Sequence, residues 1–470
     1  MTKVVIVGGG YAGFYTAFKL EKLLRRGEAE VTVIDPLPYM TYQPFLPEVA
    51  AGSIEARHAI VPLRRHLPKT RVVTARVTGV DHSKKKVTVT PEGGADFTLD
   101  YDHIVITAGA VSRTFPIPGV ADSAIGMKTI EEAISVRDRV IDNLHIAADM
   151  PPGPARDRLL TVVVVGGGFA GIEAFAELRS LVSAMLKEFP TLSIDDTHFH
   201  LIEAMDRIMP EVSLKSSLWV IKNLAERQAH IHLNTQLQSA VGGRLELSNG
   251  MVLETDIVVW TAGVKAQTML GGTGIPLDDR ERICAQADLR VTDDSEVLEG
   301  MWTAGDVARV PDLSGGGVGG YCVPNAQHAV RQGKILAKNI TAVIRGEDTK
   351  NYHHKNAGAV AGLGVGYGVF QSGNIAVVGF LAWIIHRLYH GFAIPMWERK
   401  ARVFTNWLVH LFWGRDFSSV RRVQRPRDFF EEFASRPAVV AKNTPAKKAV
   451  AGKKASPAKK PASRAKVAAR

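Results

Sequence analysis

The sequence predicts an α/β fold with two related units, each built on a parallel sheet that leads into a glycine-rich turn. Four β-branched residues precede the first turn at positions 4–7, and four valines precede the second at positions 162–165. Each turn then opens a stretch with the apolar spacing of a helix. This order of strand, turn and helix suits the pyrophosphate of a dinucleotide, because a helix N-terminus presents free N–H groups and partial positive charge.

Both turns have the spacing GxGxxG. The glycines at its fixed positions are Gly8, Gly10 and Gly13 in the first turn and Gly166, Gly168 and Gly171 in the second. The first glycine makes the tight turn, the second lets the backbone approach the phosphates, and the third allows close packing of helix on strand. One such motif is a weak signal. Two in this context predict two Rossmann-type domains that hold two dinucleotides at once.

Each unit also has an acidic residue at the end of its second predicted strand. Asp35 follows residues 31–34, and Glu203 follows residues 199–202. A carboxylate there accepts hydrogen bonds from a ribose 2′-hydroxyl and repels a 2′-phosphate, so we expect NADH rather than NADPH in the second unit. Arg207 lies close by and weakens that preference. The alternative is that either carboxylate merely caps a strand end.

A turn of small residues follows a later strand in each half. Residues 107–109 and 261–263 both read Thr-Ala-Gly, which lets the backbone pass close to a bound nucleotide. The positions concerned are Ala108 and Gly109, and Ala262 and Gly263. Because the glycine turn, the acidic strand end and this turn recur in the same order, we interpret residues 1–115 and 160–265 as an internal duplication.

A further motif, Thr-Ala-Gly-Asp at residues 303–306, ends a short strand at the start of a predicted helix. Asp306 can accept a hydrogen bond from a ribityl hydroxyl, while the backbone N–H groups near Gly305 meet a pyrophosphate. Helix capping by Asp306 is compatible with that role.

Together these motifs resemble those of the two-dinucleotide flavoprotein oxidoreductases of the glutathione-reductase type. The resemblance implies that the first unit and the Gly-Asp motif bind FAD, and that the second unit binds NADH. It sets an FAD-binding domain at residues 1–115 and 290–345 and an NADH-binding domain at residues 116–289.

Residues 322–333 resemble the Ala-Gln signature of type II NADH:quinone oxidoreductases, with Ala326 and Gln327 in the matching positions. The resemblance implies that this helix N-terminus faces the flavin ring and that Gln327 lies at the quinone site. Family members commonly carry a second glutamine one helical turn later, where this chain has Arg331. Gln332 is one residue out of register. Arg331 therefore either reaches a quinone carbonyl or points to solvent.

The same resemblance marks two other places. Glu173 matches a glutamate near the nicotinamide and the flavin; the alternative is a first-turn acid stabilised by the helix dipole. Residues 41–50 resemble the loop beneath the flavin, which puts Gln43 and Pro44 near the ring and the quinone entrance. The implied reaction passes a hydride from NADH to FAD and then two electrons to a membrane quinone, without proton pumping.

The cysteine content separates the rival functions. The chain has two cysteines, Cys284 and Cys322, and no CxxC pair, which indicates a reducing compartment and excludes a dithiol disulfide reductase. A sulfide:quinone oxidoreductase needs flavin-proximal cysteines that hold sulfur, and these two are insufficient. The rival from another class is a redox-controlled binding protein whose basic tail contacts nucleic acid. No metal site is expected.

Residues 346–436 are predicted to associate with a membrane. No run reaches the roughly 18–20 apolar residues of a spanning helix, and the longest is 375–385. Beyond it an i, i+3/i+4 stripe comprises Val403, Phe404, Trp407, Leu408, Leu411 and Phe412. Four of the seven tryptophans lie between residues 383 and 413. Such helices suit peripheral attachment at the cytoplasmic face of the cell membrane. A homodimer interface, or a helix packed on the core, is the alternative.

The net charge of +11 resides almost entirely in the C-terminal tail. Residues 441–470 carry eight lysines, two arginines and no acid, which leaves +1 on the other 440 residues. We predict that residues 437–470 are disordered, because this Ala/Lys/Pro-rich composition cannot bury a core. The expected partner of the tail is anionic lipid rather than nucleic acid; a merely solubilising tail is the alternative.

Overall fold

The computed structural model describes residues 1–267, 273–294, 296–315, 317, 319–354, 358–419, 427 and 431. Residues Met1–Arg421 form one compact unit, to which the description below applies. The predicted tail at residues 437–470 lies outside the described residues. Among the described helices, none is long and apolar enough to cross a membrane.

The first α/β unit contains a six-stranded sheet in the order β20-β21-β9-β1-β2-β5. Its strands are β1 (Thr2–Val7), β2 (Ala29–Asp35), β5 (Arg71–Thr74), β9 (His103–Ile106), β20 (Arg290–Asp293) and β21 (Glu296–Thr303). Neighbouring strands are parallel, except that β20 runs antiparallel to β21. The parallel order brings the carboxyl ends of β1, β2, β9 and β21 to one edge of the sheet, where the predicted motifs lie.

Side chains of β1 alternate between two cores, as expected for a strand buried on both faces. Val4 and Ile6 pack with α1 (Tyr11–Leu23) and α9 (Ala326–Ile344), whereas Val5 and Val7 pack with an antiparallel sheet. That sheet consists of β6 (Arg76–Asp81), β7 (Lys86–Thr90) and β8 (Phe97–Asp100).

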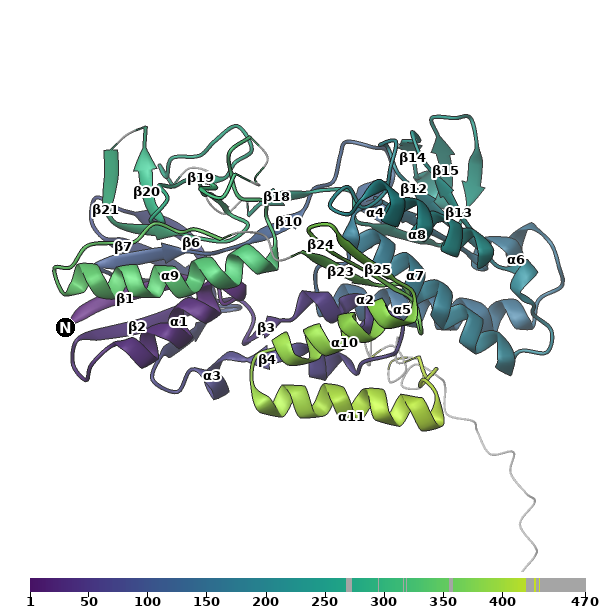
Figure 1. The fold of residues 1–470 in the computed structure, drawn as a ribbon, viewed down its shortest axis with the longest axis horizontal. Coiled ribbons are helices and arrows are strands. Elements are labelled where there is room, and N and C mark those ends of the chain that lie inside the picture. Colours follow the sequence, from purple (N-terminus) through teal and green to yellow (C-terminus); the bar gives the residue numbers. More distant parts are fainter. Residues whose placement is uncertain are drawn as a thin grey trace, which may run out of the picture. The chain divides into compact units, whose positions relative to one another are not determined.

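Helices α1 and α9 lie side by side over the first sheet (Figure 1). Their close approach depends on Gly333, where a Cβ atom would lie 2.5 Å from the Ala12 carbonyl oxygen. The Thr16 hydroxyl also lies 3.2 Å from the Gly333 carbonyl oxygen. This contact fixes the N-terminal end of α9 near the first glycine turn.

The second unit repeats the plan with a four-stranded parallel sheet in the order β13-β12-β11-β17. Its strands are β11 (Thr161–Val165), β12 (His198–Ile202), β13 (Ala229–His232) and β17 (Ile257–Trp260). Val162 and Val164 pack with α5 (Ile130–Ala148) and α7 (Phe169–Met185). Val163 and Val165 face a small antiparallel sheet formed by β14 (Leu237–Ser239), β15 (Arg244–Leu247) and β16 (Val252–Glu254). The strand order matches β5-β2-β1-β9 of the first unit, which confirms the predicted α/β fold with two related units.

A two-stranded ribbon links the two units. Strands β10 (Ala110–Ser112) and β18 (Val264–Ala266) pair antiparallel, and each directly follows one of the Thr-Ala-Gly turns. The chain then returns to the first unit, because Ile283 of β19 (Ile283–Cys284) packs in the core beneath the first sheet. The exact limits of the two domains stay a prediction.

The C-terminal region consists of an antiparallel sheet followed by two helices (Figure 1). The elements are β23 (Ala359–Gly362), β24 (Gly368–Ser372), β25 (Ile375–Val378), α10 (Phe380–Ala393) and α11 (Trp397–Trp413). The apolar run 375–385 is divided between β25 and α10 at Gly379, which has a φ of 78°.

The predicted apolar stripe of α11 does not form one face. Val403 and Trp407 are buried, and Phe404 packs against the same core. Leu411 and Phe412 are 76% and 68% exposed, and Leu408 is exposed with them. The i, i+3/i+4 spacing thus spans two adjacent faces, one packed on the protein and one exposed.

The remaining elements connect these layers. They are β3 (Tyr39–Thr41), η1 (Gln43–Phe45), α2 (Leu46–Ala50), η2 (Ala56–Ala59), β4 (Ile60–Pro62), α3 (Leu63–His66), α4 (Val120–Ser123), α6 (Pro154–Leu159), η3 (Leu186–Glu188), η4 (Ile194–Asp196), α8 (Leu214–Glu226), β14 (Leu237–Ser239), η5 (Val241–Gly243), β15 (Arg244–Leu247), β16 (Val252–Glu254) and β22 (Ala308–Arg309).

Candidate functional site

The first glycine turn has the geometry that a phosphate loop requires. Gly8 has a φ of 99°, a region that favours glycine. A Cβ at Gly13 would lie 1.8 Å from the Gly8 carbonyl oxygen, so the first turn of α1 accommodates only glycine at that position. Around Gly10, by contrast, nothing lies within 4 Å of such an atom. The open side of Gly10 is where a ligand can meet the backbone.

The second turn repeats this geometry. Gly166 has a φ of 111°, and a Cβ at Gly171 would lie 1.9 Å from the Gly166 carbonyl oxygen. Gly168 is open in the same way as Gly10. Both turns therefore present an unobstructed backbone edge at a helix N-terminus.

Two threonines that the sequence reasoning did not single out secure these turns. The Thr107 hydroxyl donates to the carbonyl oxygens of Val7 (2.9 Å) and Gly8 (3.1 Å). Thr261 makes the same contacts with Val165 (2.9 Å) and Gly166 (3.1 Å). The signal was present in the sequence, because threonine opens both Thr-Ala-Gly turns.

The two predicted acids also hold the turns. Asp35 accepts hydrogen bonds from the N–H groups of Gly9 (2.6 Å) and Leu37 (2.7 Å). Burial raises the pKa of Asp35, and these two hydrogen bonds oppose that rise. The carboxylate thus orders the loop, and Asp35 also lines the cavity described below.

Glu203 does the same in the second unit. Its carboxylate accepts from the N–H groups of Gly167 (2.5 Å) and Met205 (2.8 Å). Arg207 donates to the Val212 carbonyl oxygen at 2.6 Å, so its guanidinium is engaged by the backbone. Glu203, rather than Arg207, therefore places a charged group at the carboxyl end of β12.

A cavity of about 510 Å³ lies at the carboxyl edge of the first sheet. The predicted site residues that line it are Gly8, Gly10, Asp35, Gln43, Ala108, Gly109, Gly305 and Asp306. Residues from four separate parts of the sequence thus meet in one place. Pro44 neighbours Gln43 in the short helix η1, and Gln43 donates to the Lys128 carbonyl oxygen at 3.3 Å.

Asp306 lines this cavity. Among the described residues, none donates a hydrogen bond to it, and burial raises its pKa while Lys128 lowers it. The preceding Gly305 donates its N–H to Gln332 at 2.8 Å. Gln332, which the sequence left without a role, therefore holds the Gly-Asp turn. An open glycine edge and a buried acceptor fit the pyrophosphate and ribityl groups of FAD.

The Ala-Gln segment begins α9, with Ala326 at its first position and the Asn325 side chain accepting from the His328 N–H. The Gln327 amide contacts the His354 ring nitrogen at 2.9 Å and the Gly358 carbonyl oxygen at 3.4 Å. Arg331 donates to the Gln327 carbonyl oxygen at 3.0 Å, so it folds back along its own helix.

Glu173 is tied to the C-terminal region. Its carboxylate accepts from the Gly362 N–H at 2.9 Å and forms an ion pair with His386 at 3.2 Å. Helix α7 starts at Phe169 and has no acid in its first turn, so the alternative of a first-turn dipole role for Glu173 is wrong. Sequence reasoning missed His386, which lies 213 positions further along the chain.

The cysteines and any metal-binding cluster are the other groups that could carry chemistry. Cys322 is buried with its Sγ 3.8 Å from the Pro311 carbonyl oxygen, and burial raises the pKa of its thiol to about 11. A thiol held protonated is a poor sulfur nucleophile. In the described ranges, no cluster of three or more His, Cys, Asp and Glu side chains can hold a metal ion.

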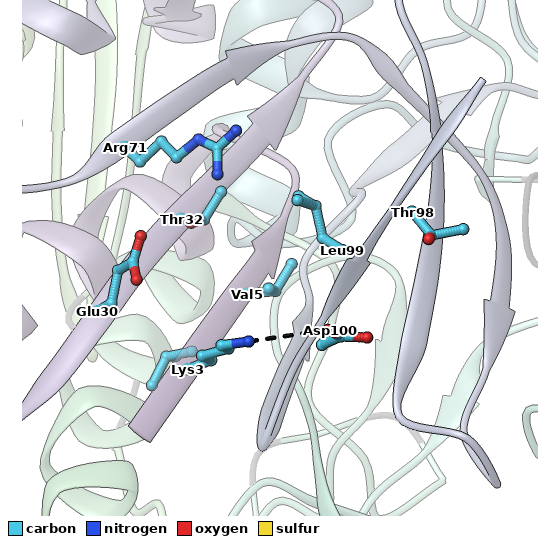
Figure 2. Close-up of a pocket in the computed structure, with 9 residues that line it drawn as sticks. Lys3, Val5, Glu30, Thr32, Arg71, Thr98, Leu99 and Asp100 are labelled. Atoms are coloured by element: carbon cyan, nitrogen blue, oxygen red, sulfur yellow. Dashed lines mark ion pairs between the residues drawn. The ribbon is translucent and has the colours of Figure 1, made fainter. Parts of the chain in front are cut away.

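A second cavity, of about 250 Å³, lies between β1, β2, β5 and β8. Figure 2 shows residues that line it. This cavity is lined by charged residues of both signs, and Lys3 pairs with Asp100 at 3.8 Å. Both side chains of that pair are more than half exposed, and the cavity contains none of the predicted site residues. We assign the chemistry to the larger cavity.

Comparison with solved structures supports the fold. NDH2 of Plasmodium falciparum, solved in complex with NADH, matches with a TM-score of 0.81 and 18% identity over 89% of this chain and 99% of that one. The sulfide:quinone oxidoreductase of Aquifex aeolicus matches with a TM-score of 0.66 and 17% identity, over 88% and 96% of the two chains.

Sequence comparison supports the resemblance as well. The type II NADH:quinone oxidoreductase NdhA of Mycobacterium tuberculosis is 27% identical over 88% of this chain and 87% of its own. A probable NADH dehydrogenase of Dictyostelium discoideum is 26% identical over 89% and 91%. These names confirm the predicted resemblance. The model of the pyridine nucleotide-disulphide oxidoreductases matches residues 2–333, and the chain belongs to that family.

Proposed function

We propose that the protein is a type II NADH:quinone oxidoreductase, which takes a hydride from NADH through bound FAD and passes two electrons to a membrane quinone without pumping protons. The observation that carries this proposal is the second glycine turn. It repeats the first contact for contact, and its acid, Glu203, excludes a 2′-phosphate by charge. A second dinucleotide site is what an NADH-dependent flavoenzyme needs.

The first unit holds FAD in this proposal. Gly8, Gly10 and Gly13 shape the pyrophosphate loop, Asp35 binds the ribose, and Asp306 binds the ribityl chain. The bound flavin supplies hydride acceptance and electron release, which no side chain provides. The backbone around Ala108, Gly109 and Gly305 supports the nucleotide from beneath.

The second unit delivers NADH. Gly166, Gly168 and Gly171 shape its loop, and Glu203 binds the ribose hydroxyls. Ala262 and Gly263, which follow β17 at the same edge, let the nucleotide approach the backbone. Glu173, on the helix that this turn opens, faces the nicotinamide side of the site.

The quinone end is assigned to Gln327, with Ala326 at the helix N-terminus and Gln43 and Pro44 across from it. Gln327 orients a quinone carbonyl through its amide, which His354 already holds in place. Arg331 contributes by steadying the Gln327 backbone rather than by direct contact.

We further propose that α10 and α11 attach the enzyme peripherally to the cytoplasmic face of the cell membrane. Exposed aromatic and aliphatic side chains gather on these helices: Phe380, Leu381, Leu388, Tyr389, Phe392, Trp397, Leu408, Leu411, Phe412 and Trp413. A patch of this composition suits the lipid interface, from which a hydrophobic quinone is collected. The basic tail adds attraction to anionic lipid. A homodimer interface is the alternative use of the patch.

Anaerobic stopped-flow absorbance tests the reaction. The purified flavoprotein is mixed with NADH and then with a short-chain quinone. Rapid bleaching of the flavin by NADH, slower bleaching by NADPH, and fast reoxidation by quinone are the expected results. Bleaching without reoxidation by quinone would overturn the acceptor assignment, and bleaching by sulfide but not by NADH would overturn the donor assignment.

A further inference from the structure

A continuous row of buried acid–base side chains runs from α7 through α10 to the loop at the larger cavity. Glu173 lies 3.2 Å from the Nε2 atom of His386. His386 and His390 lie one turn apart on α10, with ring centroids 4.8 Å apart. The Nδ1 atom of His390 lies 3.0 Å from the Tyr42 hydroxyl. Successive members are thus joined by an ion pair, an edge-on ring contact and a hydrogen bond.

The backbone positions the first pair of the row. The Gly362 N–H donates to Glu173 at 2.9 Å, and a Cβ atom at Gly362 would lie only 3.0 Å from the His386 ring. Because Gly362 has no side chain, the His386 ring can pack against β23. The N–H of Gly362 also orients the Glu173 carboxylate. The pair thus joins α7, the helix that the second glycine turn opens, to β23 and α10 of the C-terminal region.

The two ends of the row lie in different surroundings. The Glu173 side chain is 12% exposed, whereas that of His386 is 3% exposed. At the other end, the Tyr42 ring meets the Tyr11 ring edge-on at 6.0 Å, and both Tyr11 and Gln43 line the larger cavity. The row therefore runs from Glu173, whose side chain is partly exposed, to the loop that lines the larger cavity.

The charges around His386 favour a proton on its ring. The ionisable groups facing it are Glu173 and Glu177 on α7, Glu48 on α2, Arg387 and His390 on α10, and Arg415 after α11. Arg387 pairs with Glu48 at 3.5 Å, and Arg415 pairs with Glu177 at 3.4 Å. Of these three carboxylates, Glu173 is the one that pairs with His386. A protonated His386 ring therefore makes the third ion pair of the cluster.

The two histidines differ in basicity. Burial alone would lower the pKa of His386, but the contact with Glu173 and the nearby Glu48 and Glu177 charges raise it above its ordinary value. Burial and the neighbouring His386 lower the pKa of His390 far below that value. His386 is thus suited to store a proton, and His390 stays neutral, so that it can accept a proton on one ring nitrogen and release one from the other.

We propose that this row delivers the second proton of quinone reduction, with His386 as the proton store. The inference rests on the proposed function. NADH supplies a hydride equivalent, and reduction of a quinone to the quinol needs one further proton. His386 gives its proton to His390, His390 gives its Nδ1 proton to Tyr42, and the Tyr42 hydroxyl proton bonds to a quinone oxygen. Solvent then reprotonates His386 at the Glu173 end.

The test separates the two halves of the reaction in variants of the full-length holoenzyme. His386→Gln keeps a polar side chain of similar size but cannot hold a proton, and Tyr42→Phe removes the last hydroxyl. His410→Gln is the matched control, because His410 lies partly buried on α11 outside the row. Each variant is mixed anaerobically with NADH and then with a short-chain quinone, between pH 5.5 and 8.5 in steps of about one unit around the ordinary histidine range.

We expect both row variants to be bleached by NADH as fast as the unaltered enzyme and to be reoxidised by quinone about 100-fold more slowly, the usual size of a lost proton-transfer step. Their reoxidation rates should also lose the pH dependence of the unaltered enzyme. His410→Gln should behave like the unaltered enzyme. Unchanged reoxidation with an unchanged pH profile in His386→Gln would overturn the relay, as would a defect confined to bleaching by NADH.

A measurement without turnover checks the stored proton. Because the pKa of His386 is raised in the folded state, its stabilising effect is complete below about pH 6.5 and is lost as the pH rises through the raised value. The difference in Tm between the unaltered protein and His386→Gln should therefore shrink from pH 6 to pH 9. A pH-independent difference would overturn the proton store. If the unaltered enzyme is bleached by NADH but no quinone reoxidises it, the proposed function fails. The pH dependence of the Tm difference should persist in that case, because it tests only the proton stored on His386.

Discussion

Asp35 and Glu203 act on the backbone of their own turns. Asp35 accepts the N–H of Gly9, and Glu203 accepts that of Gly167. Each carboxylate also accepts the N–H two residues after itself, and all four distances lie between 2.5 and 2.8 Å. The sequence posed strand-end capping and ribose binding as alternatives, and the geometry shows that the capping contacts are present. These contacts position each carboxylate at the carboxyl end of its strand, where a ribose would lie.

Glu203→Gln should change which nicotinamide nucleotide the enzyme prefers. The amide keeps an oxygen for the Gly167 N–H but loses the charge that repels a 2′-phosphate, so the preference for NADH over NADPH should fall about tenfold. The ratio of bleaching rates with the two nucleotides measures it. Asp35→Asn is the control, because the same change in the first unit should weaken FAD binding and leave that ratio alone. An unaltered ratio in Glu203→Gln would contradict the assignment.

Gly10→Ala should separate cofactor binding from folding. The space around Gly10 is empty in the protein, so a methyl group fits there, but it occupies the approach of the pyrophosphate. Affinity for FAD should drop at least about tenfold, while the Tm of the flavin-free protein stays within about 2 °C. Gly13→Ala provides the contrast, because its methyl group would overlap the Gly8 carbonyl oxygen and destabilise the fold. Flavin titration measures the affinity, and thermal melts measure the Tm. Normal FAD binding by Gly10→Ala would contradict the assignment of this turn to the pyrophosphate.

At the scale of elements, periodicity identified helices but not their partners. The α11 stripe predicted one apolar face, whereas Trp407 is buried and donates to Glu48 at 2.8 Å, and Leu411 is exposed. Spacing of i, i+3 and i+4 covers a wide arc of a helix, so it cannot say where the buried part ends. The strands and turns were predictable because alternation and glycine positions are local signals.

Long-range contacts account for what the sequence did not predict in the site. Gln332 is one residue out of register with the second quinone-site glutamine, and in the structure it accepts the Gly305 N–H. His386 meets Glu173 only because α10 packs near α7 through β23. Neither pairing has a signature in local spacing.

Replacing the exposed residues Leu411 and Phe412 with serine should weaken attachment to lipid vesicles by about tenfold or more, because both apolar side chains are lost from the interface. Tm should not fall. Trp407→Phe should lower stability by about 1–3 kcal/mol and leave vesicle binding unchanged. The buried Glu48 carboxylate loses the indole N–H, although it keeps the ion pair with Arg387. Co-sedimentation with vesicles and thermal melts distinguish the two faces. Equal vesicle binding by the double variant would rule out this face as the anchor.

At the scale of the whole molecule, charge and chemistry occupy separate parts of the chain. Removing residues 437–470 takes ten positive charges with it and changes the net charge from +11 to +1. The predicted cofactor residues all lie before residue 345, so both half-reactions should proceed at unaltered rates in the shortened protein.

The shortened protein should bind anionic vesicles more weakly at low salt, with each lost lysine or arginine near the surface worth up to about 1 kcal/mol. Binding to zwitterionic vesicles should be unaffected, which makes them the control. If the loss were equal on both kinds of vesicle, the tail would not act through charge. Vesicle flotation at two salt concentrations measures the difference.

The near-identity of the two glycine turns has a consequence for how long each nucleotide remains bound. Because both turns offer an equivalent backbone edge and an equivalent carboxylate, from Asp35 in one and Glu203 in the other, the turn alone cannot make one nucleotide stay bound and the other exchange. The Thr-Ala-Gly-Asp motif occurs once in the chain, and its Asp306 lines the cavity of the first turn together with Gln43 and Lys128. We therefore expect these walls, rather than the turn, to decide how slowly the nucleotide of the first unit is released, and loosening them should turn a prosthetic group into a diffusible co-substrate.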